Sequence, residues 1–176
     1  MMFSDNRDIS ERDRRLKQWM DNKKVLGITP APEGINPPLS FGQQRIYFLQ
    51  ALHPDSAFYH YVEIYQVQGQ LDIDRLVMGL ELVIQRHESL RTNIKVIDGR
   101  PVQLINPKAR LEVNKLKLTQ GPAEEQEKQQ SALIQQETTK PFDLGDDPLI
   151  RLGILELSPE TFTIVLTMHH IITDQW

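Results

Sequence analysis

The chain has 176 residues, of which 39% are hydrophobic, and it carries a formal net charge of -4 at pH 7 and no cysteine. This length suits one ordinary domain or a piece of a larger protein, with enough apolar residues for a core. The acidic balance without a concentrated basic tract argues against nucleic acid and anionic membranes as partners, and a disulfide framework or a thiolate nucleophile is excluded. Without an apolar signal segment or a run of about 18 apolar residues, we expect a cytoplasmic protein that does not enter a membrane.

The first 36 residues differ in character from the rest. A short amphipathic helix over 10–24 is predicted by a capping serine and an apolar stripe among basic side chains, formed by Ser10, Leu16, Trp19 and Met20. This helix either docks on an upstream protein or packs on its own domain, and both interpretations stay open. Proline and glycine recur over 27–38 and predict a linker. We therefore divide the chain into a helix and linker over 1–36 and a folded part over 37–176.

The folded part begins with a helix and a strand. Ser40 and Gln43 have the spacing of a capping box and predict a helix that runs to about Leu52. Alternating side chains then predict a strand over 61–67.

A second helix, over 72–88, carries the strongest apolar stripe in the chain. His87 falls on this stripe, which indicates a histidine packed in the core. The Asp98-Gly99 pair is typical of a type I′ turn and predicts a hairpin over 90–105.

The second half of the chain also contains both predicted strands and a predicted helix. Strands are predicted over 111–118, 149–157 and 161–168, and a polar helix with a solvated, glutamine-rich face is expected between 121 and 140. In the last strand the alternation indicates one strongly buried face. Helices interspersed with two predicted hairpins indicate an α/β fold of mixed α+β layers, not a regular doubly wound sheet.

The last strand leads directly into His169, His170 and, four residues after the second histidine, Asp174. Imidazole titrates near pH ~6.5 and serves as acid or base, and the end of a rigid strand is a place that a substrate can reach. A metal site is a weaker interpretation, because adjacent histidines on a strand point apart and further ligands at usable spacing are lacking.

Three segments of the folded part resemble the first three motifs of condensation domains of nonribosomal peptide synthetases. They are Leu-Ser-Phe-Gly-Gln-Gln-Arg-Ile-Tyr-Phe-Leu over 39–49, Arg-His-Glu-Ser-Leu-Arg-Thr over 86–92, and the HHxxxD segment over 168–174, in the family's order and roughly its spacing. The resemblance implies a fold like chloramphenicol acetyltransferase, with two similar α/β lobes and an active site in a tunnel between them. The chain would then be the N-terminal lobe, with the second lobe absent. One departure is Gln175, where the family motif usually has glycine.

The chemistry implied by the resemblance is amide formation between two acyl groups carried as thioesters. His170 would be the catalytic residue, either as the base or as a group that holds the amine and the developing oxyanion. His169 would support it from inside the protein. Asp174 would fix the loop through a salt bridge to Arg86 or Arg91. The chain itself would bind no cofactor and no metal, since the 4'-phosphopantetheine arms belong to the carrier domains.

The partners implied are peptidyl or aminoacyl carrier protein domains and an adenylation domain of the same or an adjacent synthetase. Two alternatives stay open: a docking module that binds a carrier domain without chemistry, and an epimerisation domain, a relative that also has the HHxxxD pattern. The first segment looks more like a condensation domain, and His169 argues against the heterocyclising relative, which has aspartate there. We expect the isolated chain to be inactive, because a site with one tunnel wall missing is not desolvated.

Overall fold

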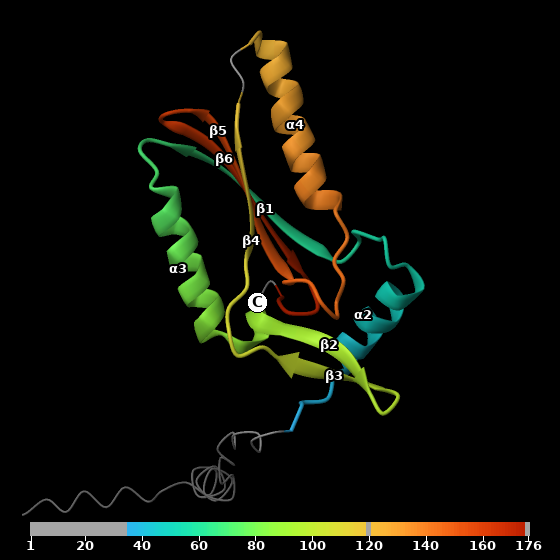
Figure 1. The fold of residues 1–176 in the computed structure, drawn as a ribbon. Helices are drawn as coiled ribbons and strands as arrows, with labels where there is room; N and C mark the ends of the chain where they lie inside the picture. Colours follow the sequence, from blue (N-terminus) through green and yellow to red (C-terminus); the bar gives the residue numbers. More distant parts are fainter. Residues whose placement is uncertain (1–34, 119–120, 175–176) are drawn as a thin grey trace, which may run out of the picture. The chain divides into compact units, whose positions relative to one another are not determined.

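The computed structural model describes residues 35–118 and 121–174. The helix predicted over 10–24 and the departure at Gln175 therefore lie outside the described residues. In chain order (Figure 1) the elements are α2 (Phe41–Leu52), β1 (His60–Gln68), α3 (Ile73–Arg86), the short 3-10 helix η1 (Glu88–Arg91), β2 (Thr92–Ile97), β3 (Arg100–Ile105), β4 (Glu112–Lys117), α4 (Ala123–Thr139), β5 (Ile150–Ser158) and β6 (Thr161–His169).

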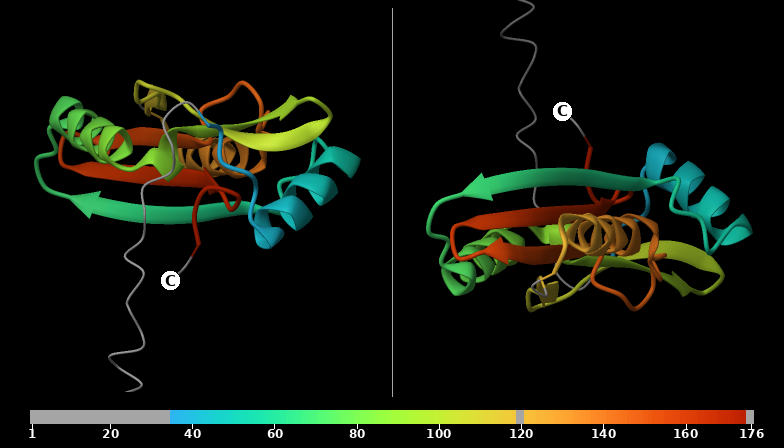
Figure 2. Two further views of the ribbon diagram at one scale, coloured as in Figure 1. Left: turned by 90° about the horizontal axis from the view of Figure 1, so that it is seen from below. Right: turned by 90° about the horizontal axis from the view of Figure 1, so that it is seen from above.

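A sheet of four strands, in the order β1-β6-β5-β4, forms the centre of the fold. Its pairs are antiparallel except for β4 and β5, which are parallel. β1 lies at one edge of this sheet, as both views of Figure 2 show. α3 and α4 lie on its two sides (Figure 1). The mixture of antiparallel hairpins, one parallel pair and covering helices confirms the predicted mixed α/β fold.

The strand that ends in the histidines is buried on both faces, so the prediction of a single buried face was wrong. Phe162 and Ile164 belong to the apolar cluster that α3 covers. The threonines on the other face, Thr163 and Thr167, are fully buried as well. They lie beneath α4, where Gln130 Nε2 donates to Thr163 Oγ1 at 2.9 Å. Threonine fits such a face because its hydroxyl can bond to the polar side of a helix.

The same contacts correct the prediction for α4. Its glutamine-rich side was expected to be solvated, but Gln130 and Glu137 face the sheet. Thr167 Oγ1 donates to the carbonyl oxygen of Glu137 at 3.2 Å, and Leu133 packs with Leu155 in an apolar cluster. α4 therefore covers the sheet with a partly polar face, which pattern analysis assigned to solvent.

The caps and turns follow the local sequence as predicted. Gln43 N–H donates to Ser40 Oγ at 3.2 Å, and Ser40 N–H donates to the Gln43 side chain at 2.9 Å, so the capping box is formed. Asp98 and Gly99 have φ values of 50° and 75°, as a type I′ turn requires. β2 begins at Thr92 and not at Leu90, because η1 occupies the preceding residues.

A third apolar cluster includes residues of the segment that follows β6. Its buried members come from the residue before the N-cap of α2, from β2, from the loop before β5 and from the residues after the histidines: Leu39, Ile94, Phe142, Leu144, Leu149, Ile171 and Ile172. The part of the HHxxxD segment that follows β6 is therefore packed on this core through Ile171 and Ile172. No helix within the described ranges is long and apolar enough to cross a membrane.

Candidate functional site

The two histidines at the end of β6 lie on opposite sides of the chain. His169 is 0% exposed, whereas His170 is exposed to solvent. Successive side chains of a strand point to opposite faces, so a strand that ends at His169 separates the pair. The expectation that His169 points into the protein is confirmed.

Backbone hydrogen bonds hold both histidines from two sides. His169 N–H donates to the carbonyl oxygen of Leu149, which precedes β5, at 2.9 Å. His170 N–H donates to the carbonyl oxygen of Tyr59, which precedes β1, at 2.8 Å. The chain then turns, with Ile172 N–H donating to His169 O at 3.1 Å. The backbone at the histidine pair is thus attached to both neighbouring strands of the sheet.

The ring of His169 stabilises this turn. Its Nδ1 accepts a hydrogen bond from the N–H of Ile171 at 3.1 Å. The side chain thus binds the amide two residues later, as in an Asx turn. Its Nε2 lies 3.5 Å from Gln50 Oε1, and Gln50 Nε2 donates to Pro54 O. The oxygen of Gln50 is therefore the acceptor, and His169 carries its proton on Nε2.

The protonation state of His169 is set by burial. Desolvation lowers its pKa to about 3, and repulsion by the nearby histidines His60 and His170 acts in the same direction. His169 is therefore neutral at neutral pH, which the bond from Ile171 to its Nδ1 requires.

All three sequence motifs meet at a cavity of about 680 Å³ that His170 lines. Gln43, from the first motif, donates through Nε2 to the carbonyl oxygen of Ile171 in the third, at 3.1 Å. The other polar lining residues include Ser40, His87, Ser89, Thr173 and Asp174. Residues far apart in the sequence are thus brought together around His170, and the cavity offers polar groups to a ligand.

His87 lines this cavity and is exposed, so the prediction of a packed core histidine was wrong. α3 ends at Arg86, and His87 is its C-cap with φ -103° and ψ 107°. This extended backbone turns the side chain away from the apolar stripe on which helical spacing had placed it.

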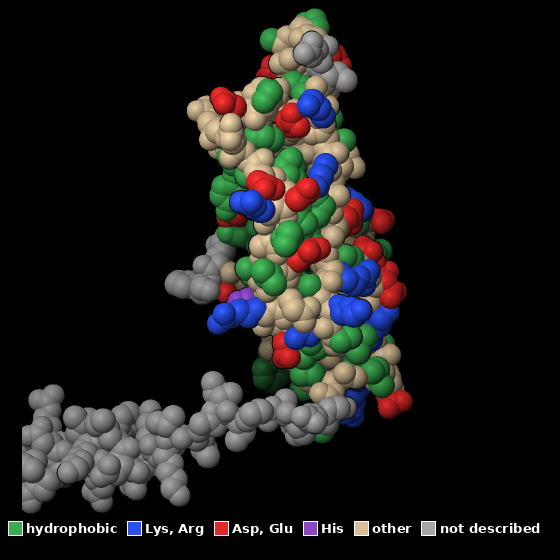
Figure 3. Space-filling model, turned by 60° about the vertical axis from the view of Figure 1, so that its left-hand side comes forward, with side chains coloured by type: hydrophobic (Ala, Val, Ile, Leu, Met, Phe, Trp, Pro, Cys, Tyr) green, Lys and Arg blue, Asp and Glu red, His purple; other side chains and the backbone are tan. Residues whose placement is uncertain are grey.

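On the face that carries α3, charges of both signs are interspersed with hydrophobic side chains (Figure 3).

The two arginines expected near Asp174 differ in their surroundings. Arg91 donates to the carbonyl oxygens of Gln85 and Asn106 and pairs with Glu88, with 3.4 Å between Nη2 and Oε1. These local partners occupy the guanidinium of Arg91, and a pair between Arg91 and Asp174 stays a prediction.

Arg86 lies exposed in the last turn of α3, and Asp174 is an exposed residue of the cavity. A pair between these two stays a prediction.

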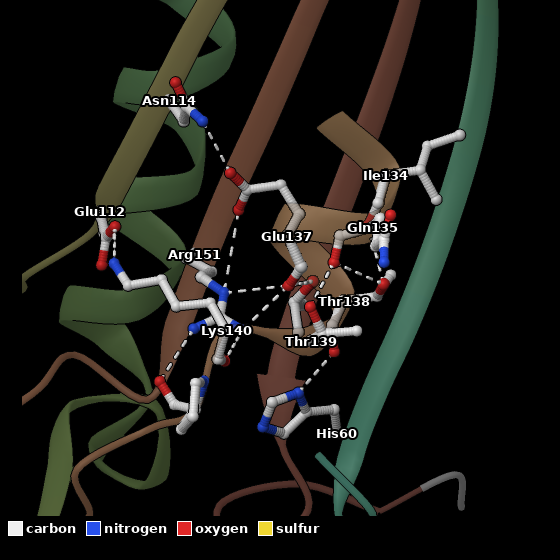
Figure 4. Close-up of polar contacts among 12 residues, drawn as sticks. His60, Glu112, Asn114, Ile134, Gln135, Glu137, Thr138, Thr139, Lys140 and Arg151 are labelled. Atoms are coloured by element: carbon white, nitrogen blue, oxygen red, sulfur yellow. Dashed lines mark hydrogen bonds and ion pairs between the residues drawn. The ribbon is translucent and has the colours of Figure 1, made fainter. Parts of the chain in front are cut away.

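The cation that pattern analysis missed is Arg151, which is 1% exposed in β5. Its guanidinium donates to the carbonyl oxygens of Glu137, at 2.9 and 3.1 Å, of Lys140, and of Pro141, at 3.4 Å. Its Nε lies 3.8 Å from the carboxylate of Glu137, which also accepts from Asn114 at 2.9 Å (Figure 4). Arg151 thus caps the end of α4, where positive charge is favourable.

One signal in the sequence pointed to Arg151: it is the single charged residue in the run from 149 to 155. A buried charge needs partners, which here come from the end of α4.

Metal ligation finds no support in the part of the chain that the structure describes. Residues 35–118 and 121–174 contain no group of three or more histidine, aspartate and glutamate side chains that could hold a metal ion.

Comparison with known proteins agrees with this fold. The family model described as "Condensation domain" matches residues 36–176. A linear gramicidin synthase of Brevibacillus parabrevis is 36% identical over 168 residues, covering 96% of this chain and 2% of that protein. Surfactin synthase subunit 2 of Bacillus subtilis (strain 168) is 34% identical over 165 residues, covering 92% of this chain and 4% of that protein.

A solved structure, the starter condensation domain of rhizomide synthetase RzmA, superposes with a TM-score of 0.71 and 25% identity. The match covers 80% of this chain and 34% of that one. The fold thus defines part of a condensation domain. The chain belongs to the condensation-domain family of nonribosomal peptide synthetases, and it spans about a third of the solved domain.

Proposed function

We propose that the chain forms the part of a condensation domain that supplies the catalytic imidazole, His170, for peptide-bond formation between two carrier-bound thioesters. The observation that carries the proposal is the location of His170. It is the exposed member of the histidine pair, and it lines the cavity at which all three motifs meet.

The chemistry is the attack of an acceptor amine on the carbonyl carbon of a donor thioester. The C–N bond forms, the C–S bond breaks, and the amine loses a proton that finally protonates the departing thiolate. An α-amine titrates near pH ~8, so a basic group at the amine assists the step. The imidazole of His170 either takes this proton or holds the amine and the oxyanion by hydrogen bonds.

The neighbouring histidine is not suited to that task. The Nδ1 of His169 accepts from Ile171, and its Nε2 carries the proton that points to Gln50. No lone pair is then left on the ring for a substrate proton. This division favours His170 as the group that contacts the substrate and His169 as a group that acts through the backbone.

The substrates would be presented by carrier domains, each with its acyl group on 4'-phosphopantetheine, and the acids would be activated by an adenylation domain. The similarity to synthetases that make gramicidin and surfactin supports this context. We further propose that the isolated chain does not turn over. The match covers only 34% of the solved relative, and amide formation needs an enclosed site from which water is excluded.

The test uses donor and acceptor carrier domains loaded with aminoacyl thioesters, with the chain alone and within a complete condensation domain. We expect product only from the complete domain, and a loss of at least about 100-fold in the His170→Ala variant. His53→Ala is the matched control, because His53 is an exposed histidine at the end of α2 and should retain activity.

A complete domain that binds both carriers but forms no product would contradict the proposal and indicate a docking module. Undiminished product with His170→Ala would contradict the assignment of the catalytic residue.

A further inference from the structure

A third histidine lies beside the pair, although no motif contains it. His60 is the first residue of β1 and the direct cross-strand partner of His169. The centroids of the two rings are 6.2 Å apart. The side chain of His60 can therefore affect the orientation of His169, whose ring stabilises the turn that contains His170.

The ring of His60 connects β1 to the end of α4. Its Nδ1 lies 2.8 Å from the carbonyl oxygen of Thr138 (Figure 4). A carbonyl oxygen only accepts, so Nδ1 carries the proton and donates it. Arg151 fixes the same end of α4 through the carbonyl oxygens that it binds. The start of β1 is thus attached to a rigid part of the molecule.

The other side of the ring packs against aromatic groups. Phe142 meets His60 edge to face, with centroids 5.0 Å apart, and meets His169 edge to face at 6.0 Å. The guanidinium of Arg151 lies 4.0 Å from the centroid of the same phenylalanine ring. His60 Nε2 is buried and has no hydrogen-bond partner among the described residues. The rings of His60 and Phe142 therefore restrict the orientation of His169 by packing.

A second link runs through the backbone. The residue before His60 is Tyr59, and its carbonyl oxygen accepts from His170 N–H at 2.8 Å. A shift at the start of β1 therefore moves the acceptor that holds His170. The side-chain link through His169 and the backbone link through Tyr59 converge on the same catalytic residue.

We propose that His60 is a positioning residue: by bonding to Thr138 and packing on the ring of His169, it fixes the backbone that carries His170. The inference rests on the proposed function, because misplacement of His170 affects the rate only if His170 contacts the substrate. Its effect should fall on kcat, since His60 lies behind the strand end and is not among the residues that line the cavity.

The first experiment compares two substitutions in a complete condensation domain with loaded carriers. His60→Phe keeps a ring but removes the donor to Thr138, and His60→Asn keeps a donor close to the position of Nδ1. We expect His60→Phe to lower kcat by about three- to tenfold with KM changed less than about twofold, and His60→Asn to keep kcat close to the wild-type value. His53→Phe is the control on an exposed histidine.

An unchanged kcat in His60→Phe, or an equal loss in His60→Asn, would overturn the inference. The proposed function fails separately: it is contradicted if His170→Ala stays active. If His170→Ala is inactive while His60→Phe is fully active, only the role of His60 is refuted.

The second experiment needs no activity and uses the 176-residue chain. Hydrogen exchange should become faster at the amides of His170 and Ile171 in His60→Phe, while amides in the middle of β5 keep their rates. Unchanged exchange at both amides would contradict the inference. If His60→Phe does not fold, His60→Ala takes its place in the same measurement, because a smaller side chain introduces no overlap.

Discussion

Two regions of the molecule meet at the end of β6. One is the buried region between the sheet and α4, and the other is the cavity lined by His170. The chain passes from the first to the second in the single step from His169 to His170. Behind the strand, Arg151 and Glu137 are buried and paired, and His169 is held neutral. In the cavity, His170 and His87 are exposed. The buried side fixes one backbone geometry, and the open side offers groups that can bind and exchange protons. The alternation of a strand assigns two adjacent histidines to these different tasks.

The largest effect is expected for Arg151→Met, which leaves the carboxylate of Glu137 buried without its cation and the end of α4 without its cap. Breaking a buried pair in this way should lower the free energy of unfolding by about 3–5 kcal/mol, measured by urea denaturation. The control is Lys117→Met, which breaks a pair between the exposed Lys117 and the partly buried Glu156 and should cost at most about 1 kcal/mol. Equal effects of the two substitutions would remove the distinction between the two regions.

The second prediction concerns pH. The pKa of His169 is about 3 in the folded chain and near 6.5 when unfolded, so between these values the unfolded chain binds more protons. Folding stability should therefore fall as the pH falls from about 6.5 toward 3, by about 1.4 kcal/mol per pH unit from this residue. Burial also lowers the pKa of His60, which adds to the same trend.

Denaturation of the wild type and of His169→Asn at pH 7 and pH 5 measures this contribution. The asparagine oxygen can still accept from Ile171 but does not titrate. We expect the wild type to lose about 2 kcal/mol more than the variant over this interval. Equal losses would mean that His169 is not held neutral by burial.

The third prediction concerns the first motif. Ser40→Ala removes the hydroxyl that accepts from Gln43 N–H and should lower the free energy of unfolding by about 1 kcal/mol. Ser89→Ala, at another residue of the same cavity, is the comparison and should have a smaller effect. A larger loss of unfolding free energy in Ser89→Ala than in Ser40→Ala would contradict a stabilising role of the capping box.

The smallest effect is expected for His87→Ala. An exposed residue at a helix end should change the free energy of unfolding by no more than about 0.5 kcal/mol, as thermal denaturation would measure. A histidine packed in the core would cost several times more, so a loss of about 2 kcal/mol or above would contradict its location in the cavity.

The helices, strands and turns were predicted well because their sequence signals depend only on neighbouring residues. The capping box at Ser40 and the turn at Asp98 depend on neighbours within four residues. The failures involve distant partners. The burial of Thr163 and Thr167 depends on α4, and the surroundings of Arg151 depend on the carbonyl groups at the end of that helix. Periodicity placed His87 on an apolar stripe, but the stripe ends where the backbone becomes extended.

For the site, the three motifs predicted which segments come together, and the family resemblance, not the alternation of the strand, indicated which histidine is buried. The supporting residues were not predicted. His60 and Phe142 lie in no motif, and their contacts with His169 arise only when β1 pairs with β6 and the loop before β5 folds against them.

The central claim is that the two adjacent histidines differ in role, with His170 acting on the substrate and His169 acting through the backbone. The most direct measurement compares product formation by His170→Ala and His169→Asn in a complete condensation domain with loaded carriers. We predict a loss of at least about 100-fold for His170→Ala and less than about tenfold for His169→Asn. The reverse order, with His169→Asn inactive and His170→Ala active, would contradict the account.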